Sequence, residues 1–447
     1  MKFSECALRI GALLVFGLGC SASLGVNDDQ GGGNNGGETG IPGTVPPTPR
    51  SNGLVFVSHF YEDAITGRNL LQWYRADKTS PEFLGEMDVG ATTHSMALDK
   101  ENELLAVISD TSRKVTLYNL NGTAAGEVPL VLSSIDFFDE IPLFADFDSD
   151  SNRLYVSASP TDVSGLTTNN SLYVYDTSNP NAPQPISGSP FNIPVTASWG
   201  VDPFRNVLWL VDFRENELLG YDLLENGIEE IPGGAIRLTE LYPEENQASF
   251  QARDLTIDPW RNRIYAARSQ GALSELIAID YPSDVPDAGQ RYGSLVSMTS
   301  LKKVEDAIDV SLPTDNRPTL LDGYEVALNE STGEVFVSGL SWNGRAASGA
   351  IVAYNRGLDG FAGGCEPTGG QGCWIETFTE VGSTFKQTDG AFCVGDMVAA
   401  TSISSPETDP GFMHFFAKDE NGQFEQVLNS QRENFRASSF PISAVCF

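Results

Sequence analysis

The sequence predicts an all-β protein, a seven-bladed β-propeller of four-stranded antiparallel blades, and three observations lead to this prediction. Short apolar segments recur along the chain after residue 52, and none of them shows a sustained helical period. Many of these segments close on Asp or Asn at a tight turn. The 447 residues include 44 Gly and 25 Pro, which suits many turns. Small sheets that repeat radially form a propeller.

The repeat is clearest in a strand that ends in an aromatic or aliphatic residue, often followed by Asp or Asn. Its seven copies are LLQWYR (ending at Arg75), VTLYN (Asn119), LYVYD (Asp176), LLGYD (Asp222), LIAID (Asp280), IVAYN (Asn355) and MHFFA (Ala417). A denser apolar strand precedes each copy, from LVFV at Leu54 to VAAT at Val398. Sheets stacked on both sides bury both faces of such middle strands, so a nearly continuous apolar run is expected.

A third kind of strand closes on Asp or Asn just before each pair. Its six copies are SMALD (Asp99), FADFD (Asp148), SWGVD (Asp202), DLTID (Asp258), YEVALN (Asn329) and FCVGD (Asp396). Seven pairs but six closing strands leave one blade incomplete. The C-terminal segment SFPISAVCF fits the missing innermost strand of the first blade, so we expect the last residues to close the ring. A six- or eight-bladed ring is the alternative count.

The N-terminus is an export signal over residues 1–19. Lys2 and Arg9 precede a short apolar run that ends in Gly-Leu-Gly-Cys at Cys20. This ending resembles the lipobox of bacterial lipoproteins, although that family usually has Leu where this chain has Gly17. An ordinary signal cleaved after a small residue such as Ala22 is the alternative.

The lipobox resemblance implies that Cys20 carries fatty acyl chains such as palmitate and holds the protein at a membrane. Ser21 stands where Asp favours inner-membrane retention in these lipoproteins, which implies an outer-membrane lipoprotein facing the periplasm or the cell surface. Residues 20–51 are rich in Gly and then in Pro, and we expect them to form a flexible linker. Residues 52–447 are then the propeller.

The segments VDPFRNVLWLVD and IDPWRNRIYAA resemble the YVTN-type and lactonase-like seven-bladed propeller repeats of bacteria. The resemblance covers residues 52–447 and implies the fold. It leaves the activity open, because that superfamily contains enzymes, binding proteins and scaffolds.

Charge restricts the partners. The formal net charge is −33, which repels nucleic acid phosphates and argues against a nucleic-acid role. We expect a monomer whose partners are a membrane, through the lipid, and an unidentified protein or glycan.

The cysteines after the signal and the lipid site predict disulfides, because an exported compartment is oxidising. Cys365 and Cys373 flank one Gly-rich loop and are natural partners, which leaves Cys393 to pair with Cys446. A metal site is the poorer alternative, because the sequence has no C-x-x-C pair.

The long connections are expected at the end of the ring where the innermost strands begin, so a site is expected there. The first residues of those strands would surround the channel mouth: His94, Trp199, Arg253, Asp254, Tyr324, Glu325 and Asp389. A structural role is favoured for three of them: a plain polar rim residue for His94, packing between blades for Trp199 and a salt bridge for Arg253. Glu325 and Asp389 are candidates for a general acid and base.

No metal cofactor is predicted, and calcium is a weak possibility. Asp146, Asp148 and Asp150 space oxygen ligands by two, as a calcium loop does, but an Asp-rich turn explains them more simply. The sequence contains no G-x-S-x-G, H-E-x-x-H or P-loop pattern.

These observations favour a cell-envelope lipoprotein whose propeller is a binding scaffold for a protein or glycan. The alternative is a lactonase-like hydrolase with its site at the mouth of the channel.

Overall fold

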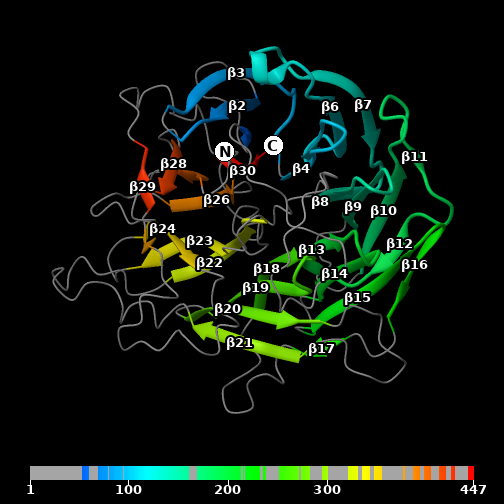
Figure 1. Ribbon diagram of the computed structural model, residues 1–447. Helices are drawn as coiled ribbons and strands as arrows, with labels where there is room; N and C mark the ends of the chain where they lie inside the picture. Colours follow the sequence, from blue (N-terminus) through cyan, green and yellow to red (C-terminus); the bar gives the residue numbers. More distant parts are fainter. Residues whose placement is uncertain are drawn as a thin grey trace, which may run out of the picture.

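The strands stand in sheets arranged radially around a common centre (Figure 1). The computed structural model describes residues 53–446 with gaps, the longer of which are 60–68, 161–168, 238–250, 282–293, 301–320, 355–375, 378–385, 404–411 and 428–440. Within this part of the chain the strands form seven antiparallel sheets, numbered here 1 to 7 in chain order. The propeller with four-stranded antiparallel blades is therefore confirmed.

Sheets 1 to 3 contain the first part of the chain and its last strand. From the outside inward, sheet 1 consists of β3 (Glu82–Asp88), β2 (Leu70–Ala76), β1 (Gly53–His59) and β30 (Pro441–Cys446). From the inside outward, sheet 2 consists of β4 (Ser95–Asp99), β5 (Leu104–Ser109), β6 (Lys114–Asn119) and β7 (Leu130–Asp136). Sheet 3 consists of β8 (Glu140–Asp148), β9 (Arg153–Pro160), β10 (Asn170–Asp176) and β11 (Gln184–Pro185), with β12 (Phe191–Ile193) also paired to β10.

Sheets 4 and 5 follow in chain order. Sheet 4 consists of β13 (Thr196–Asp202), β14 (Val207–Asp212), β15 (Glu217–Leu224) and β16 (Gly227–Glu230), with β17 (Ile236–Arg237) also paired to β15. Sheet 5 consists of β18 (Gln251–Asp258), β19 (Arg263–Gln270), β20 (Leu273–Asp280) and β21 (Ser294–Ser300).

Sheets 6 and 7 complete the set. Sheet 6 consists of β22 (Leu321–Leu328), β23 (Val335–Trp342), β24 (Ala347–Tyr354) and β25 (Glu376–Thr377). Sheet 7 consists of β26 (Lys386–Phe392), β27 (Val398–Ile403), β28 (Phe412–Lys418) and β29 (Phe424–Gln426). A single 3₁₀ turn (Thr123–Ala125) interrupts the described strands, and no described helix is long and apolar enough to cross a membrane.

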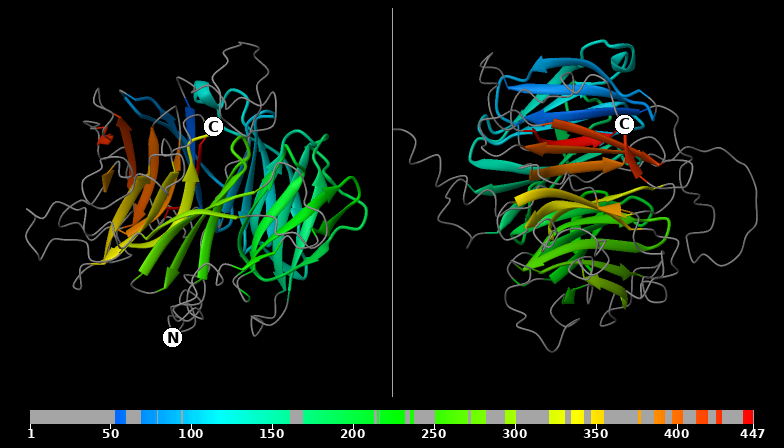
Figure 2. Two further views of the ribbon diagram at one scale, coloured as in Figure 1. Left: turned by 60° about the horizontal axis from the view of Figure 1, so that its bottom comes forward. Right: turned by 90° about the vertical axis from the view of Figure 1, so that its left-hand side faces the viewer.

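The last strand pairs with the first one. In β30, Val445 lies opposite Phe56 of β1, and the strand also contacts β26 and β4. Figure 2 shows β30 between the N-terminal strands and β26. The innermost strands thus contact one another in the order β30, β4, β8, β13, β18, β22, β26 and back to β30.

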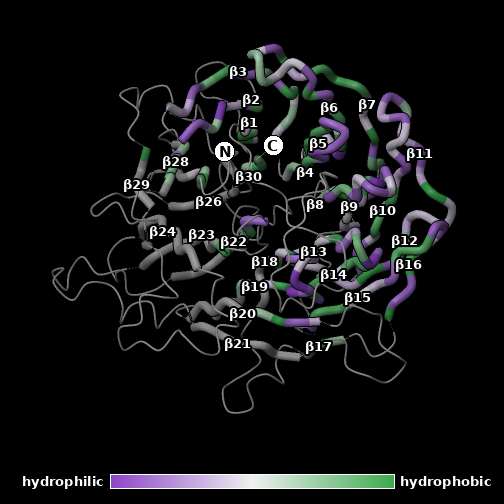
Figure 3. The backbone as a smooth tube through the Cα atoms, viewed as in Figure 1, coloured by the Kyte–Doolittle hydropathy of each residue, from purple (hydrophilic) through white to green (hydrophobic). Residues whose placement is uncertain are grey.

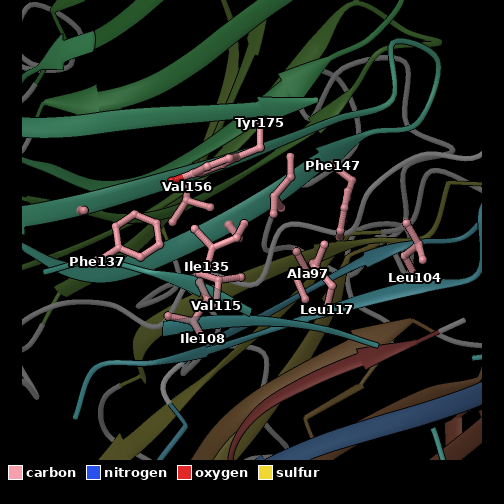
Figure 4. Close-up of a cluster of buried hydrophobic side chains, with 14 residues drawn as sticks. Ala97, Leu104, Ile108, Val115, Leu117, Ile135, Phe137, Phe147, Val156 and Tyr175 are labelled. Atoms are coloured by element: carbon pink, nitrogen blue, oxygen red, sulfur yellow. The ribbon is translucent and has the colours of Figure 1, made fainter. Parts of the chain in front are cut away.

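Apolar side chains fill the spaces between neighbouring sheets. The cluster between sheets 2 and 3 is drawn in Figure 4 and includes Ile108, Val115, Leu117, Ile135, Phe147, Val156 and Tyr175. Similar clusters lie between sheets 1 and 2, 3 and 4, 4 and 5, and 7 and 1. The hydrophobic stretches within the described strands are visible in Figure 3. Burial on both faces explains why the middle strands show no polar–apolar alternation.

In four sheets the repeated Asp lies at the end of the innermost strand, where the chain turns into the next strand. Asp202 Oδ1 accepts hydrogen bonds from the backbone N–H groups of Phe204 (3.0 Å) and Arg205 (3.2 Å), so it holds the turn into β14. Four residues after this Asp the backbone is left-handed, with φ of 51° at Asn206, a conformation that Asn tolerates. The carbonyl of that residue then accepts the N–H of Leu223 at 2.7 Å, directly beside the third strand.

Asp99 and Asp148 hold the corresponding turns through backbone N–H groups, and the left-handed residues there are Glu103 and Asn152. In sheet 5 the guanidinium of Arg261 donates to Asp258, and Asn262 is the left-handed residue. We call this end of the ring, where the innermost strands finish, the turn end, and the opposite end the mouth end.

Deleting residues 440–447 tests the role of β30. We expect the thermal midpoint to fall by more than about 5 °C, because β1 loses its inner partner and buried side chains such as Val445 lose their contacts. The exposed strand edges should also promote association. Thermal unfolding and light scattering check this, with deletion of linker residues 31–38 as the control. A truncated protein that stays monomeric with an unchanged midpoint would contradict the assignment.

Candidate active site at the mouth end

Six of the seven innermost strands contain a register shift near the mouth end. In β18 the pairing with β19 skips one position between Ala252 and Asp254. Shifts of the same kind occur in β8, β13, β22, β26 and in the pairing of β1 with β30. The unpaired positions are Leu143, Ala197 with Ser198, Arg253, Tyr324, Thr388 and Ile442. Bulges at barrel rims and next to active sites redirect side chains, so this level of the ring is the candidate site.

Three predicted site residues have backbones at this level. Arg253 is the extra residue of the bulge in β18, and Glu325 and Asp389 follow the bulges in β22 and β26. Their side chains, and the whole of His94, lie outside the described residues. Whether these side chains converge on one opening therefore stays a prediction.

Trp199 packs between blades. Its side chain is 2% exposed and lies in the apolar cluster of sheets 3 and 4, beside Tyr155 and Leu210. The indole Nε1 donates a hydrogen bond to Ser157 Oγ of sheet 3 at 3.1 Å. The structure thus gives Trp199 the packing role between blades that the sequence favoured over a place lining the mouth.

Asp254 joins three sheets directly behind the Arg253 bulge. The side chain is 1% exposed, and its Oδ1 accepts a hydrogen bond from Ser198 Oγ of sheet 4 at 2.5 Å. Its Oδ2 accepts the backbone N–H of Val326 in sheet 6 at 2.8 Å. Ser198 Oγ in turn accepts the N–H of Leu255 at 3.2 Å. The bulges of sheets 4, 5 and 6 are therefore linked by one hydrogen-bonded group.

A buried histidine at the same end escaped the sequence analysis. His59 is fully buried at the end of β1, and its Nε2 lies 3.1 Å from Gln72 Oε1. An amide oxygen only accepts, so Nε2 donates here. The carbonyl of His59 accepts hydrogen bonds from both N–H and Oγ1 of Thr93, the residue before His94. In the sequence His59 only marks the start of a loop, and nothing there indicates this contact.

One ion pair at the turn end joins two sheets that are not neighbours in the ring. Lys100 follows β4 of sheet 2 and Glu330 follows β22 of sheet 6. Lys100 Nζ lies 3.4 Å from Glu330 Oε1, and both side chains are largely buried. This contact links sheets 2 and 6 across the centre of the turn end.

The three aspartates considered for calcium do not form a common site. Asp146 and Asp148 are buried in β8, whereas Asp150 is exposed in the following turn. Asp148 accepts the N–H of Ser151 at 3.2 Å, as the turn aspartates do. Among the described residues no group of three His, Cys, Asp or Glu side chains could hold a metal ion. The arrangement fits the Asp-rich turn that the sequence favoured over a calcium loop.

Asp146 is a buried acid between sheets 3 and 4. Its oxygens accept the backbone N–H groups of Phe147 at 2.9 Å and Val201 at 3.3 Å. Burial raises the pKa of this carboxyl well above its usual range, and the nearby Asp148 adds to the shift. The two hydrogen bonds oppose this shift without cancelling it.

Cys446 is the one cysteine among the described residues, and it is disulfide-bonded. Its partner lies outside the described residues, as do Cys365 and Cys373. The pairing of Cys393 with Cys446 and that of Cys365 with Cys373 stay predictions.

No family model and no curated protein matches this chain. Solved structures match over almost its whole length. A putative 6-phosphogluconolactonase from Bacteroides uniformis has a TM-score of 0.56 at 11% identity, covering 89% of this chain and 100% of that one. The periplasmic gluconolactonase of Pseudomonas aeruginosa has a TM-score of 0.57 at 13% identity, covering 89% and 99%. A hypothetical selenium-binding protein from Sulfolobus tokodaii reaches 0.56 at 11% identity, covering 90% and 92%. At these identities the likeness shows a shared propeller fold.

Replacing Asp146 with Asn tests the buried acid. The folded pKa lies above the unfolded one, so the folded state binds more protons, and stability from this group is lost as pH rises. We therefore expect the free energy of unfolding of the wild type, relative to Asp146→Asn, to fall as pH rises from the unfolded pKa of aspartate, about 4, toward the raised folded pKa. Urea unfolding at several pH values measures it.

The surface variant Asp139→Asn removes the same charge from an exposed position and is the control. If the difference in the free energy of unfolding between wild type and Asp146→Asn stays constant with pH, the expectation is contradicted.

Proposed function

We propose that this chain is a lactonase-like hydrolase with its site at the mouth of the ring. The observation that carries the proposal is the common level of the bulges, with Arg253 in one of them and Glu325 and Asp389 directly after two others. Fold likeness to two proteins named as lactonases supports it. This reverses the preference of the sequence analysis, which placed the binding scaffold first.

The chemistry requires few groups. Water adds to the lactone carbonyl carbon, and the carbonyl oxygen becomes an oxyanion. The ring ester bond then breaks, and the departing alkoxide takes up a proton. Arg253 would stabilise the oxyanion, Glu325 or Asp389 would accept the proton from water, and His94 would return a proton to the leaving oxygen.

We also infer that the seven sheets make one closed seven-bladed ring. The pairing of β30 with β1 and the sequence of contacts among innermost strands support this count. A closed ring of this kind leaves no exposed innermost strand edge at the centre.

The membrane anchor at Cys20 is part of the proposal. The Gly-Leu-Gly-Cys ending supports acylation, with the linker 20–51 holding the ring away from an outer membrane. A lactonase tethered there would act on lactones outside the cytoplasm.

The scaffold function remains a second candidate because of one outer strand. Leu130 and Val131 at the start of the edge strand β7 are 65% and 52% exposed, and Phe138 beyond its end is 81% exposed. An exposed apolar edge of this kind is typical of a contact with another protein.

Hydrolysis of D-glucono-1,5-lactone tests the catalytic proposal. Acid release at constant pH should exceed the spontaneous rate with wild-type protein. Arg253→Ala should lower kcat/KM by about 100-fold, the usual effect of losing an oxyanion partner. Arg113→Ala is the control, because Arg113 lies at the mouth end but on the outer part of sheet 2, bonded to the carbonyl of Phe138. Wild-type protein with no rate above background would refute the proposal.

Replacing Cys20 with Ala tests the anchor. The variant should move from the membrane fraction to the soluble fraction after cell fractionation, because the acylation site is gone. Cys6→Ala, within the expected signal, should stay in the membrane fraction. A Cys20→Ala variant that remains in the membrane pellet, with no lipid on the wild type, would exclude lipidation.

A further inference from the structure

We propose that Asp254 is a positioning residue that sets the geometry of the mouth by holding the bulges of three consecutive sheets in one arrangement. The kinetic part of this inference rests on the proposed lactonase activity. The structural part does not.

The contacts of Asp254 differ from those of the aspartates at the turn end. A turn aspartate such as Asp202 mainly binds N–H groups of its own turn. Asp254 instead receives Ser198 Oγ–H from one neighbouring sheet and Val326 N–H from the other. Each of these partners stands in or just beyond a bulge. A buried carboxylate that is hydrogen-bonded to both neighbouring sheets limits how far the three innermost strands can shift along one another.

Asp254 directly follows Arg253, the candidate cation of the proposed site. Arg253 is the extra residue of the bulge and has no partner position in β19. Its neighbour Asp254 is held at 2.5 and 2.8 Å by two other sheets. On the far side, Val326 directly follows Glu325. One side chain thus fixes the backbone beside a candidate cation and a candidate carboxylate.

The strand β18 supplies a matched control. Asp258 lies on the same strand, four residues further on, is equally buried, and is bonded to Arg261 at the turn end. Asp254→Ala and Asp258→Ala both remove a buried carboxylate from β18. Only the first removes a contact at the mouth end.

Hydrogen exchange of the full chain is the first readout. In Asp254→Ala we expect faster exchange in peptides covering 196–200, 251–255 and 321–327, the three linked bulges. In Asp258→Ala the faster peptides should be those of the turn after residue 258. Ser198→Ala breaks only the link to sheet 4 and should spare 321–327. Faster exchange confined to sheet 5, or spread evenly over all sheets, would overturn the proposal. If Asp254→Ala fails to fold, Asp254→Asn and Ser198→Ala give the same comparison.

Kinetics with D-glucono-1,5-lactone is the second readout. Asp254→Ala should lower kcat/KM by at least about 30-fold, as a displacement of about 1 Å does in other sites, whereas Asp258→Ala should stay within threefold of wild type. Equal losses in the two variants would reduce Asp254 to a purely structural role. A wild type inactive on the lactone, combined with the three-bulge exchange pattern, would refute the lactonase while retaining the positioning role.

Discussion

The buried carboxylates at the ends of the innermost strands impose the constraint on which the ring depends. At the centre the innermost strands of the sheets lie close together, and their backbone N–H groups are buried. Each buried N–H group needs a hydrogen-bond acceptor. Aspartate occupies this position in four successive turns, at Asp99, Asp148, Asp202 and Asp258, none of which is more than 3% exposed. The first three accept backbone N–H groups of their own turns. Two of them also accept a hydroxyl from the next sheet: Ser149 Oγ bonds Asp99 at 2.8 Å and Tyr281 OH bonds Asp202 at 2.5 Å. The same group therefore closes a turn and ties two sheets together.

The two ends of the ring use these groups for different purposes. At the turn end two of the carboxylates are paired with cations: Arg205 lies 2.7 Å from Asp202, and Arg261 lies 2.7 Å from Asp258. Arg205 also bonds Asn262 and the carbonyl of Pro259 in sheet 5. The pair of Lys100 and Glu330 adds a polar contact across the centre of this end. At the mouth end the strands bulge instead, and the sequence there varies from Leu143 to Arg253. A scaffold that repeats at one end and varies at the other is suited to carry a site at the variable end.

Much of the fold could be predicted from the sequence, because its signals are local. The middle strands are continuous apolar runs, and the four turns carry Asp at one position with Asn or, after Asp99, Glu four residues later. The outermost strands lack such a signal. In β3 most residues are only partly buried, and β11, β17 and β25 are two residues long. The extra strands β12 and β17 form by pairing with β10 and β15, and no local sequence pattern indicates this pairing.

The site was less predictable than the fold for a related reason. Sequence register correctly brought Arg253, Glu325 and Asp389 to the level where innermost strands begin. It could not locate the bulges, and a single extra residue exchanges the faces of a strand. That is why Asp254, predicted among the mouth residues, is buried between sheets. The contacts that fix this level, from Ser198 to Asp254 to Val326, join residues 56 and 72 positions apart. Only the radial arrangement of the sheets brings these residues together, so the geometry at this level depends on contacts between sheets.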